Sequence, residues 1–181
     1  MAINLGLDIG AISLKLAALG KPGDRPILEA LCAGHPQFRM ASIGERPLVL
    51  SDYRRIGGSH IQSTYDLLQE FYEVVPGVQV EGMRVTGSGS RTIAKVLGLF
   101  FENEFKAIAH MMAQFYPQVR TVFEIGGESS KYIRLDGGSI VDYDRSGECA
   151  AGTGSFIDQQ ALRMQYSVEE VGAVVSTARS E

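Results

Sequence analysis

Residues 7–16, LDIGAISLKL, decide the fold when they are set beside residues 123–132, FEIGGESSKY. Both stretches follow one pattern: an apolar residue, an acid, Ile, Gly, two variable residues, Ser, a variable residue and Lys. In each stretch an apolar run meets a glycine turn and a second run follows, which predicts two strands joined by a tight turn. Repetition at long period indicates a duplicated architecture.

The duplicated turn suits a phosphate group. Backbone N–H groups of a glycine turn form a concavity for anions, and the missing side chain allows close approach. A carboxylate just upstream repels phosphate, so its useful partner is Mg²⁺, bound directly or through water. One copy alone favours an ordinary hairpin whose glycines satisfy turn geometry, whereas the pair favours a nucleotide.

Other nucleotide motifs are missing from the sequence. The chain has no G-x-x-x-x-G-K-[ST] string, and GSGSR at 87–91 lacks the last glycine of a dinucleotide-binding fingerprint. We therefore predict neither a P-loop nor a Rossmann site.

Composition narrows the class of protein. A content of 45% hydrophobic and 21% charged residues is typical of a soluble globular protein. The net charge of −4, with scattered Lys and Arg, gives no field that would attract nucleic acid or an anionic membrane. Apolar runs such as 96–101 are too short to span a bilayer, and the N-terminus has no targeting pattern. The two cysteines, Cys32 and Cys149, suit a reducing compartment, so we expect a cytoplasmic protein.

Periodicity and cap signals predict the remaining elements. We expect strands at 3–9, 12–19, 27–33, 80–86, 121–125, 131–135 and 139–143. We expect helices from the Ser59 cap to before Pro76, and at 91–99, 104–115, 156–164 and 168–175. The stretch 34–47 has no clean period and no element is assigned to it. The last residues, STARSE, carry no helix stop, so we expect the second half to continue beyond them.

Four strings carry a resemblance to a known group of proteins. They are LGLDIGAISLK at 5–15, VTGSGSR at 85–91, FEIGGESSKYIRL at 123–135 and CAAGTGSFID at 149–158. Together they resemble the actin, hexokinase and Hsp70 superfamily, and within it the activators of 2-hydroxyacyl-CoA dehydratases and of benzoyl-CoA reductase. The string CAAGTGSF is the most distinctive of the four.

This resemblance implies an α/β, ribonuclease-H-like fold with the first half complete (1–118) and the second half truncated (119–181). It implies that ATP or ADP and Mg²⁺ are held by paired phosphate loops. It also implies a homodimer that shares one [4Fe–4S] cluster and passes an electron to a dehydratase or reductase when ATP is hydrolysed. The resemblance places Asp8, Glu124 and Glu128 in catalysis, with Asp8 also serving magnesium through water. The phosphate-binding residues it implies are Gly10, Ala11, Ile12, Ser13, Gly126 and Gly127.

Cys149 has three possible roles by its own chemistry: nucleophile, metal ligand or small packed thiol. The resemblance favours the cluster ligand, and N–H groups of the following GTG would stabilise its thiolate. Cys32 lies in an apolar stretch and is expected in the core. The three histidines, His35, His60 and His110, are expected at the surface or in packing. With one ligand per chain, a four-thiolate cluster would not assemble on this segment alone.

Departures from the family pattern predict slow hydrolysis of ATP. Ala11 and Ile12 stand where hydroxyl residues are usual, and Glu124, Glu128 and Ser129 replace Asp, Gln and Asp. Two other functions stay open at this point. One is a sugar or N-acetylglucosamine kinase-like protein, for which Asp142 and Asp144 are the nearest candidate bases. The other is a non-catalytic module that senses a nucleotide.

Overall fold

The computed structural model describes residues 1–147 and 152–178, which form two compact units, Met1–Ile108 and Ala109–Glu181. The strands are β1 (Ala2–Ile9), β2 (Ser13–Leu19), β3 (Phe38–Ile43), β4 (Arg46–Ser51), β5 (Arg54–Arg55), β6 (Gln79–Thr86), β7 (Phe100–Phe101), β8 (Thr121–Ile125), β9 (Ser130–Asp136) and β10 (Ser139–Arg145). The helices are α1 (Arg25–Cys32), α2 (His60–Val74), α3 (Ser90–Leu97), α4 (Glu104–Phe115), α5 (Gly154–Arg163) and α6 (Val171–Ser176). The two units divide within α4, whereas the sequence predicts a boundary after residue 118.

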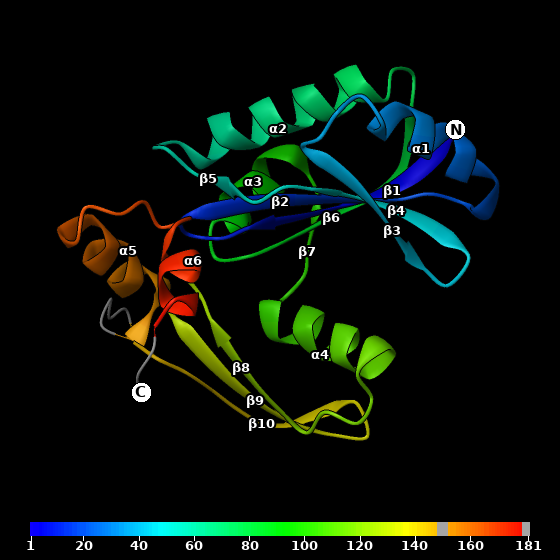
Figure 1. Cartoon of the computed structure of the whole chain (residues 1–181). Helices are drawn as coiled ribbons and strands as arrows, with labels where there is room; N and C mark the ends of the chain where they lie inside the picture. Colours follow the sequence, from blue (N-terminus) through cyan, green and yellow to red (C-terminus); the bar gives the residue numbers. More distant parts are fainter. Residues whose placement is uncertain (148–151, 179–181) are drawn as a thin grey trace. The chain divides into compact units, whose positions relative to one another are not determined.

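The first unit is built on one mixed sheet with strand order β3-β4-β2-β1-β6-β7, and β5 pairs with β2. The β1–β2 pair is antiparallel, as the predicted hairpin requires, and β1 pairs with β6 in parallel. Figure 1 shows α2 running along one face of this sheet. The sheet therefore holds the first glycine turn at one end of β1, beside the end of β6.

Helix α2 begins and ends where the sequence predicts. The Ser59 side chain accepts a hydrogen bond from the Gln62 N–H, and the last helical residue is Val74, two residues before Pro76. The buried positions Thr64, Leu67, Phe71 and Val74 recur at helical spacing and so form one face.

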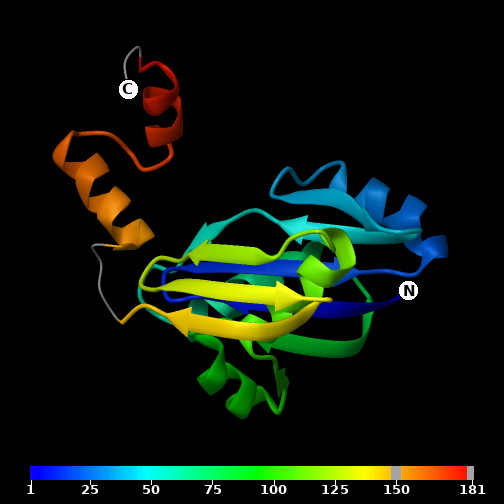
Figure 2. The same cartoon turned by 90° about the horizontal axis from the view of Figure 1, so that it is seen from below.

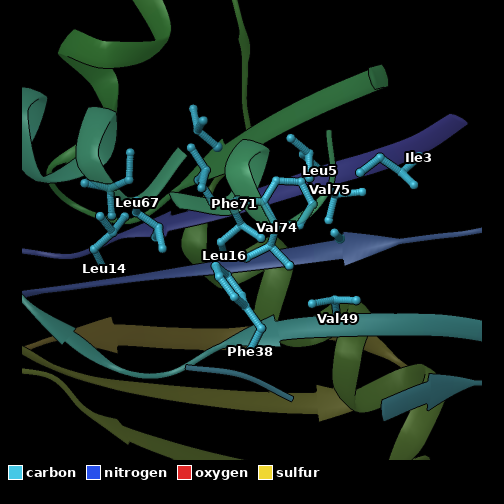
Figure 3. Close-up of a cluster of buried hydrophobic side chains, with 14 of the residues drawn as sticks. Ile3, Leu5, Leu14, Leu16, Phe38, Val49, Leu67, Phe71, Val74 and Val75 are labelled. Carbon is cyan, nitrogen blue, oxygen red and sulfur yellow. The ribbon is translucent and has the colours of Figure 1, made fainter. Parts of the chain in front are cut away.

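The buried face of α2 covers the apolar side of the sheet (Figure 3). Alternate residues of β1 are buried because successive side chains of a strand point to opposite faces. Phe71 lies edge-on to Phe38 of β3, with ring centroids 5.9 Å apart. This core fixes the register of the hairpin that carries the first turn.

Two predictions for the first unit are wrong. Residues 27–33 were expected as a strand, but α1 forms there because Pro26 starts the helix and Leu28 and Cys32, four residues apart, both turn inward. The stretch 34–47 was expected to be irregular, but it contains β3 and the start of β4. Gly44, with φ of +58°, opens the short turn that joins the two strands.

The second unit contains the three-stranded antiparallel sheet β10-β9-β8. The strands predicted at 121–125, 131–135 and 139–143 are confirmed, and the last two are slightly longer than expected. Figure 2 shows these strands side by side as a meander, with α5 and α6 beyond one end of the sheet. The helix predicted at 168–175 begins later, at Val171, although the expected cap contact from the Ser167 N–H to Glu170 Oε2 is present at 2.7 Å.

Across 1–147 and 152–178, the structure contains no helix of the length and apolar character needed to cross a membrane.

Candidate functional site: two glycine turns

The two predicted turns are closed by equivalent backbone hydrogen bonds. The Gly10 N–H donates to the Ser13 carbonyl at 2.8 Å, and the Gly126 N–H donates to the Ser129 carbonyl at 2.9 Å. Each turn joins two antiparallel strands, β1 to β2 and β8 to β9. The repeat in the sequence is therefore a repeat in structure, at the level of single hydrogen bonds.

Each turn leaves two adjacent N–H groups open. Those of Ala11 and Ile12 in the first turn, and of Gly127 and Glu128 in the second, donate to no other residue in the described part of the chain. Successive backbone N–H groups of this kind form an anion-binding concavity. A side chain at Gly126 would crowd the second turn, because its Cβ would lie 2.9 Å from the Ser129 carbonyl oxygen. The turns can thus take phosphate oxygens without rearranging their own hydrogen bonds.

The acid of each hairpin is paired with the lysine of the same hairpin. Lys15 Nζ lies 3.0 Å from Asp8 Oδ2, and Lys131 Nζ lies 2.6 Å from Glu124 Oε2. Both pairs are direct cross-strand partners in the register of their hairpins. The lysine is part of the repeated sequence pattern, but the pattern alone indicates no role for it. Each carboxylate therefore has a cation beside it already, and its assignment to magnesium or catalysis stays a prediction.

The two pairs differ in burial. The Lys131 side chain is only 5% exposed and that of Glu124 is 35% exposed, whereas Lys15 and Asp8 are 44% and 45% exposed. An ammonium group costs free energy to bury unless a charge or hydrogen bond compensates it. Glu124 therefore contributes to the stability of the second hairpin.

The glycine loop, residues 85–91 (VTGSGSR), packs on the end of the first hairpin. The Gly89 N–H donates to the Ile9 carbonyl at 2.8 Å, and Ser90 Oγ donates to the Gly87 carbonyl at 2.6 Å. Gly87 has φ of +99°, and a Cβ there would lie 2.3 Å from the Ile9 oxygen, so glycine is required. Thr86 Oγ1 is the one buried side-chain oxygen or nitrogen of the described residues that has no hydrogen-bond partner.

A histidine completes the surroundings of the first turn. His60 Nε2, from the first residue of α2, lies 3.2 Å from the Gly10 carbonyl oxygen. The sequence expectation of a surface or packing residue missed this contact, since a single histidine far from the turn in sequence carries no pattern. His110, by contrast, is exposed on α4, as expected.

The second turn is held by the start of α5. The Gly154 N–H donates to the Gly126 carbonyl at 2.9 Å, and the Ser155 N–H donates to the Gly127 carbonyl at 3.2 Å. Ser155 Oγ also donates to the Gly127 carbonyl. The N–H groups of GTG (152–154) were expected to stabilise the Cys149 thiolate, but the N–H of Gly154 is bonded to the second turn.

The remaining residues that the sequence suggested for catalysis or metal binding differ in exposure. Glu128 is exposed at the second turn, and Asp142 and Asp144 are exposed on β10, where Asp144 accepts from the Arg145 N–H. Cys32 is buried as expected, and burial raises the pKa of its thiol. Cys149 lies outside the described residues. Among the residues that are described, no group of three or more His, Cys, Asp or Glu side chains is arranged to hold a metal ion.

The sequence pattern of one protein family runs through both turns, the glycine loop and α5. Residues 5–181 match the BadF/BadG/BcrA/BcrD ATPase family. The chain belongs to this family. The resemblance drawn from the four strings is therefore confirmed.

Relatives in this ATPase family include the activator of lactoyl-CoA dehydratase from Anaerotignum propionicum, which is 33% identical over 176 residues. That match covers 93% of this chain and 56% of the relative. The 2-hydroxyisocaproyl-CoA dehydratase activator of Clostridioides difficile is 35% identical over 66 residues, 36% of this chain and 25% of the relative. The chain thus spans little more than half the length of the lactoyl-CoA dehydratase activator.

Solved structures confirm the expected fold. The activator of the 2-hydroxyisocaproyl-CoA dehydratase from Clostridium difficile with bound ADPNP superposes with a TM-score of 0.69 at 22% identity, over 99% of this chain and 58% of that one. Component A of the (R)-2-hydroxyglutaryl-CoA dehydratase from Acidaminococcus fermentans gives 0.68 at 20% identity, over 100% and 61%. The chain therefore has the α/β architecture of the actin, Hsp70 and hexokinase-like ATPases.

Proposed function

We propose that this chain binds ATP and ADP, and that both glycine turns bind phosphate oxygens. The observation that carries the proposal is the pair of equal turns, each with two adjacent open N–H groups and a lysine–carboxylate pair on the strands beside it. Membership of an ATPase family supports it, as does the ADPNP bound to one relative in the same fold.

The residues of each turn suit phosphate oxygens and magnesium. Gly10, Ala11, Ile12 and Ser13 would line the first turn, and Gly126 and Gly127 the second. Lys15 and Lys131 would offset phosphate charge. Magnesium, when bound, supplies further positive charge to the phosphate oxygens. Asp8 would reach that ion through a water molecule, while its Oδ2 accepts from Lys15.

We further propose that the longer protein is an ATP-dependent activator of an acyl-CoA dehydratase or reductase. The supporting observations are the family and the names of the relatives. On this proposal Glu124 and Glu128 orient the group that attacks the terminal phosphate. Cys149 would be a [4Fe–4S] ligand in a cytoplasmic homodimer, and the substitutions in both turns would make hydrolysis slow.

A second candidate is a nucleotide-binding module without turnover. The observation that favours it is the engagement of both acids by lysines, together with Ala11 and Ile12 in place of hydroxyl residues. The two candidates differ in ADP release under saturating ATP, which the activator shows and the module does not.

Nucleotide binding is tested by titrating the chain with ADP and Mg²⁺ in a calorimeter. We expect binding that Gly126→Ala weakens at least tenfold, because the added Cβ would lie 2.9 Å from the Ser129 carbonyl. Gly57→Ala is the matched control, since its Cβ would meet no atom within 4 Å. Absence of ADP binding at millimolar concentration in the unaltered chain would reject the proposal.

The cluster is tested separately in the longer protein by Cys149→Ser and anaerobic reconstitution. Loss of bound iron is expected. Unchanged iron content would show that Cys149 is not a cluster ligand.

A further inference from the structure

The first glycine of each turn has its carbonyl held from the start of the next long helix of its unit. In the second turn the Gly126 carbonyl accepts from the N–H of Gly154, the first residue of α5, at 2.9 Å. In the first turn the Gly10 carbonyl lies 3.2 Å from Nε2 of His60, the first residue of α2. Equivalent carbonyls are thus bound from equivalent places, by a backbone group in one unit and a side chain in the other.

Holding this carbonyl orients the next N–H group. A peptide unit is planar and trans, so its C=O and N–H point in opposite directions. When His60 fixes the Gly10 oxygen on the side of α2, the N–H of Ala11 is directed away from α2, out of the turn. That N–H is one of the two that have no acceptor in the described part of the chain.

The imidazole of His60 is itself held in place. A Cβ on Gly89 would lie 2.4 Å from His60 Cδ2, which shows that the ring lies directly against the glycine loop. The backbone of His60 is fixed too, since its carbonyl accepts from Thr64 Oγ1 at 2.7 Å and the Ser59 side chain caps the helix. The ring therefore approaches Gly10 from a rigid base.

We propose that His60 is a positioning residue for the first turn. With the proton on Nε2, its ring donates to the Gly10 carbonyl and presents the Ala11 N–H to a phosphate oxygen, as the Gly154 N–H does for the second turn. The phosphate part of this inference rests on the proposed function, whereas the effect on the turn does not.

The test compares ADP–Mg²⁺ affinity of the full chain with that of two variants. His60→Ala should weaken binding about three- to tenfold, the equivalent of one hydrogen bond of about 1 kcal/mol. His60→Gln should restore most of the affinity, because its amide can place an N–H near the position of Nε2. His110→Ala, on an exposed site, should bind as the unaltered chain does. Equal affinity of His60→Ala and the unaltered chain would overturn the proposal.

A second measurement separates failure of this inference from failure of the proposed function. In the ligand-free chain, the ¹⁵N–¹H signal of Ala11 should shift or broaden in His60→Ala and return toward its original position in His60→Gln. If no form binds ADP but this NMR pattern is seen, the nucleotide proposal fails and the positioning role stands. If the Ala11 signal is the same in all forms, the positioning role fails whether or not ADP binds.

Discussion

One chemical pair occurs in two environments in this chain, and burial decides what each pair contributes. Asp8 and Lys15 are both nearly half exposed, so their mutual attraction is weakened by water. Lys131 is almost fully buried, and the Glu124 carboxylate, 2.6 Å from its ammonium group, offsets part of the cost of that burial. The same sequence pattern therefore gives a partly exposed ion pair in the first hairpin and a largely buried ion pair, which contributes more to stability, in the second.

Removing the two acids should accordingly have unequal effects on stability. We expect Glu124→Gln to lower the free energy of unfolding by about 2–3 kcal/mol, because it removes a negative charge 2.6 Å from a buried ammonium group. Asp8→Asn should cost less than about 1 kcal/mol. Urea unfolding followed by circular dichroism measures both. Equal losses of stability for the two substitutions would contradict the importance of burial for these pairs.

At the scale of single elements, helix α5 is tied to the second turn by its first two N–H groups. These are groups that an α-helix leaves unsatisfied within itself. The turn supplies the missing acceptors, so the start of α5 and the geometry of Gly126 and Gly127 depend on each other.

Gly154→Pro isolates this connection. Proline suits the first position of a helix and lacks an N–H, and Thr153 before it is already extended, with φ of −135° and ψ of 173°. We expect α5 to remain helical while the hydrogen bond to Gly126 is lost. Stability should fall by more than about 1 kcal/mol, because the proline Cδ would also crowd the Gly126 oxygen, which lies 2.9 Å from the Gly154 nitrogen, and amide exchange of the residues in the second turn should accelerate. Loss of α5 itself, seen as reduced helical signal, would contradict this expectation.

Strand β5 and helix α2 are joined by a charged pair whose strength depends on pH. Arg54 donates from two nitrogens to both carboxylate oxygens of Glu70, one at 2.6 Å, and this lowers the pKa of Glu70. A carboxyl with a lowered pKa in the folded state contributes stability above its unfolded pKa. It loses that contribution as the pH falls through the folded value.

The corresponding prediction concerns the difference between the unaltered chain and Glu70→Gln. At pH 7 the variant should be less stable by at most about 1 kcal/mol, because the pair is partly exposed. The difference should shrink as the pH drops below about 4.5 and vanish in strong acid. Thermal unfolding of both forms from pH 7 to pH 2.5 measures this. A difference that grows in acid would contradict the prediction.

How far the sequence predicts each element depends on where its information lies. Helix α2 has a local cap at Ser59 and a local stop at Pro76, and it is predicted correctly. Residues 27–33 are apolar at several adjacent positions and fit a strand as well as a helix until Pro26 is weighed as a helix start. The contact of His60 with Gly10 could not be predicted from the sequence, because it joins residues fifty positions apart.

At the scale of the whole molecule, the repeat makes each half a reference for the other. Leu7 and Ile9 of the first hairpin are 1% and 0% exposed, beneath the apolar face of α2. Phe123 and Ile125 hold the same places in the repeat but are 73% and 70% exposed. The pattern predicted two equal hairpins and could not show this difference, because burial depends on what packs over the sheet.

Substitution by threonine should have unequal effects on stability at the matched positions. Leu7→Thr should lower the free energy of unfolding by about 3 kcal/mol or more, since it removes buried carbon and buries a hydroxyl. Phe123→Thr and Ile125→Thr should each lower the free energy of unfolding by less than about 1 kcal/mol, because threonine suits an exposed strand position. They should also reduce binding of the dye ANS by shrinking an exposed apolar patch. Denaturation and dye titration on the same samples measure both effects. A large loss of stability at Phe123 and Ile125 would mean that this face is packed in solution, in which case the two halves are more alike than their exposed fractions indicate.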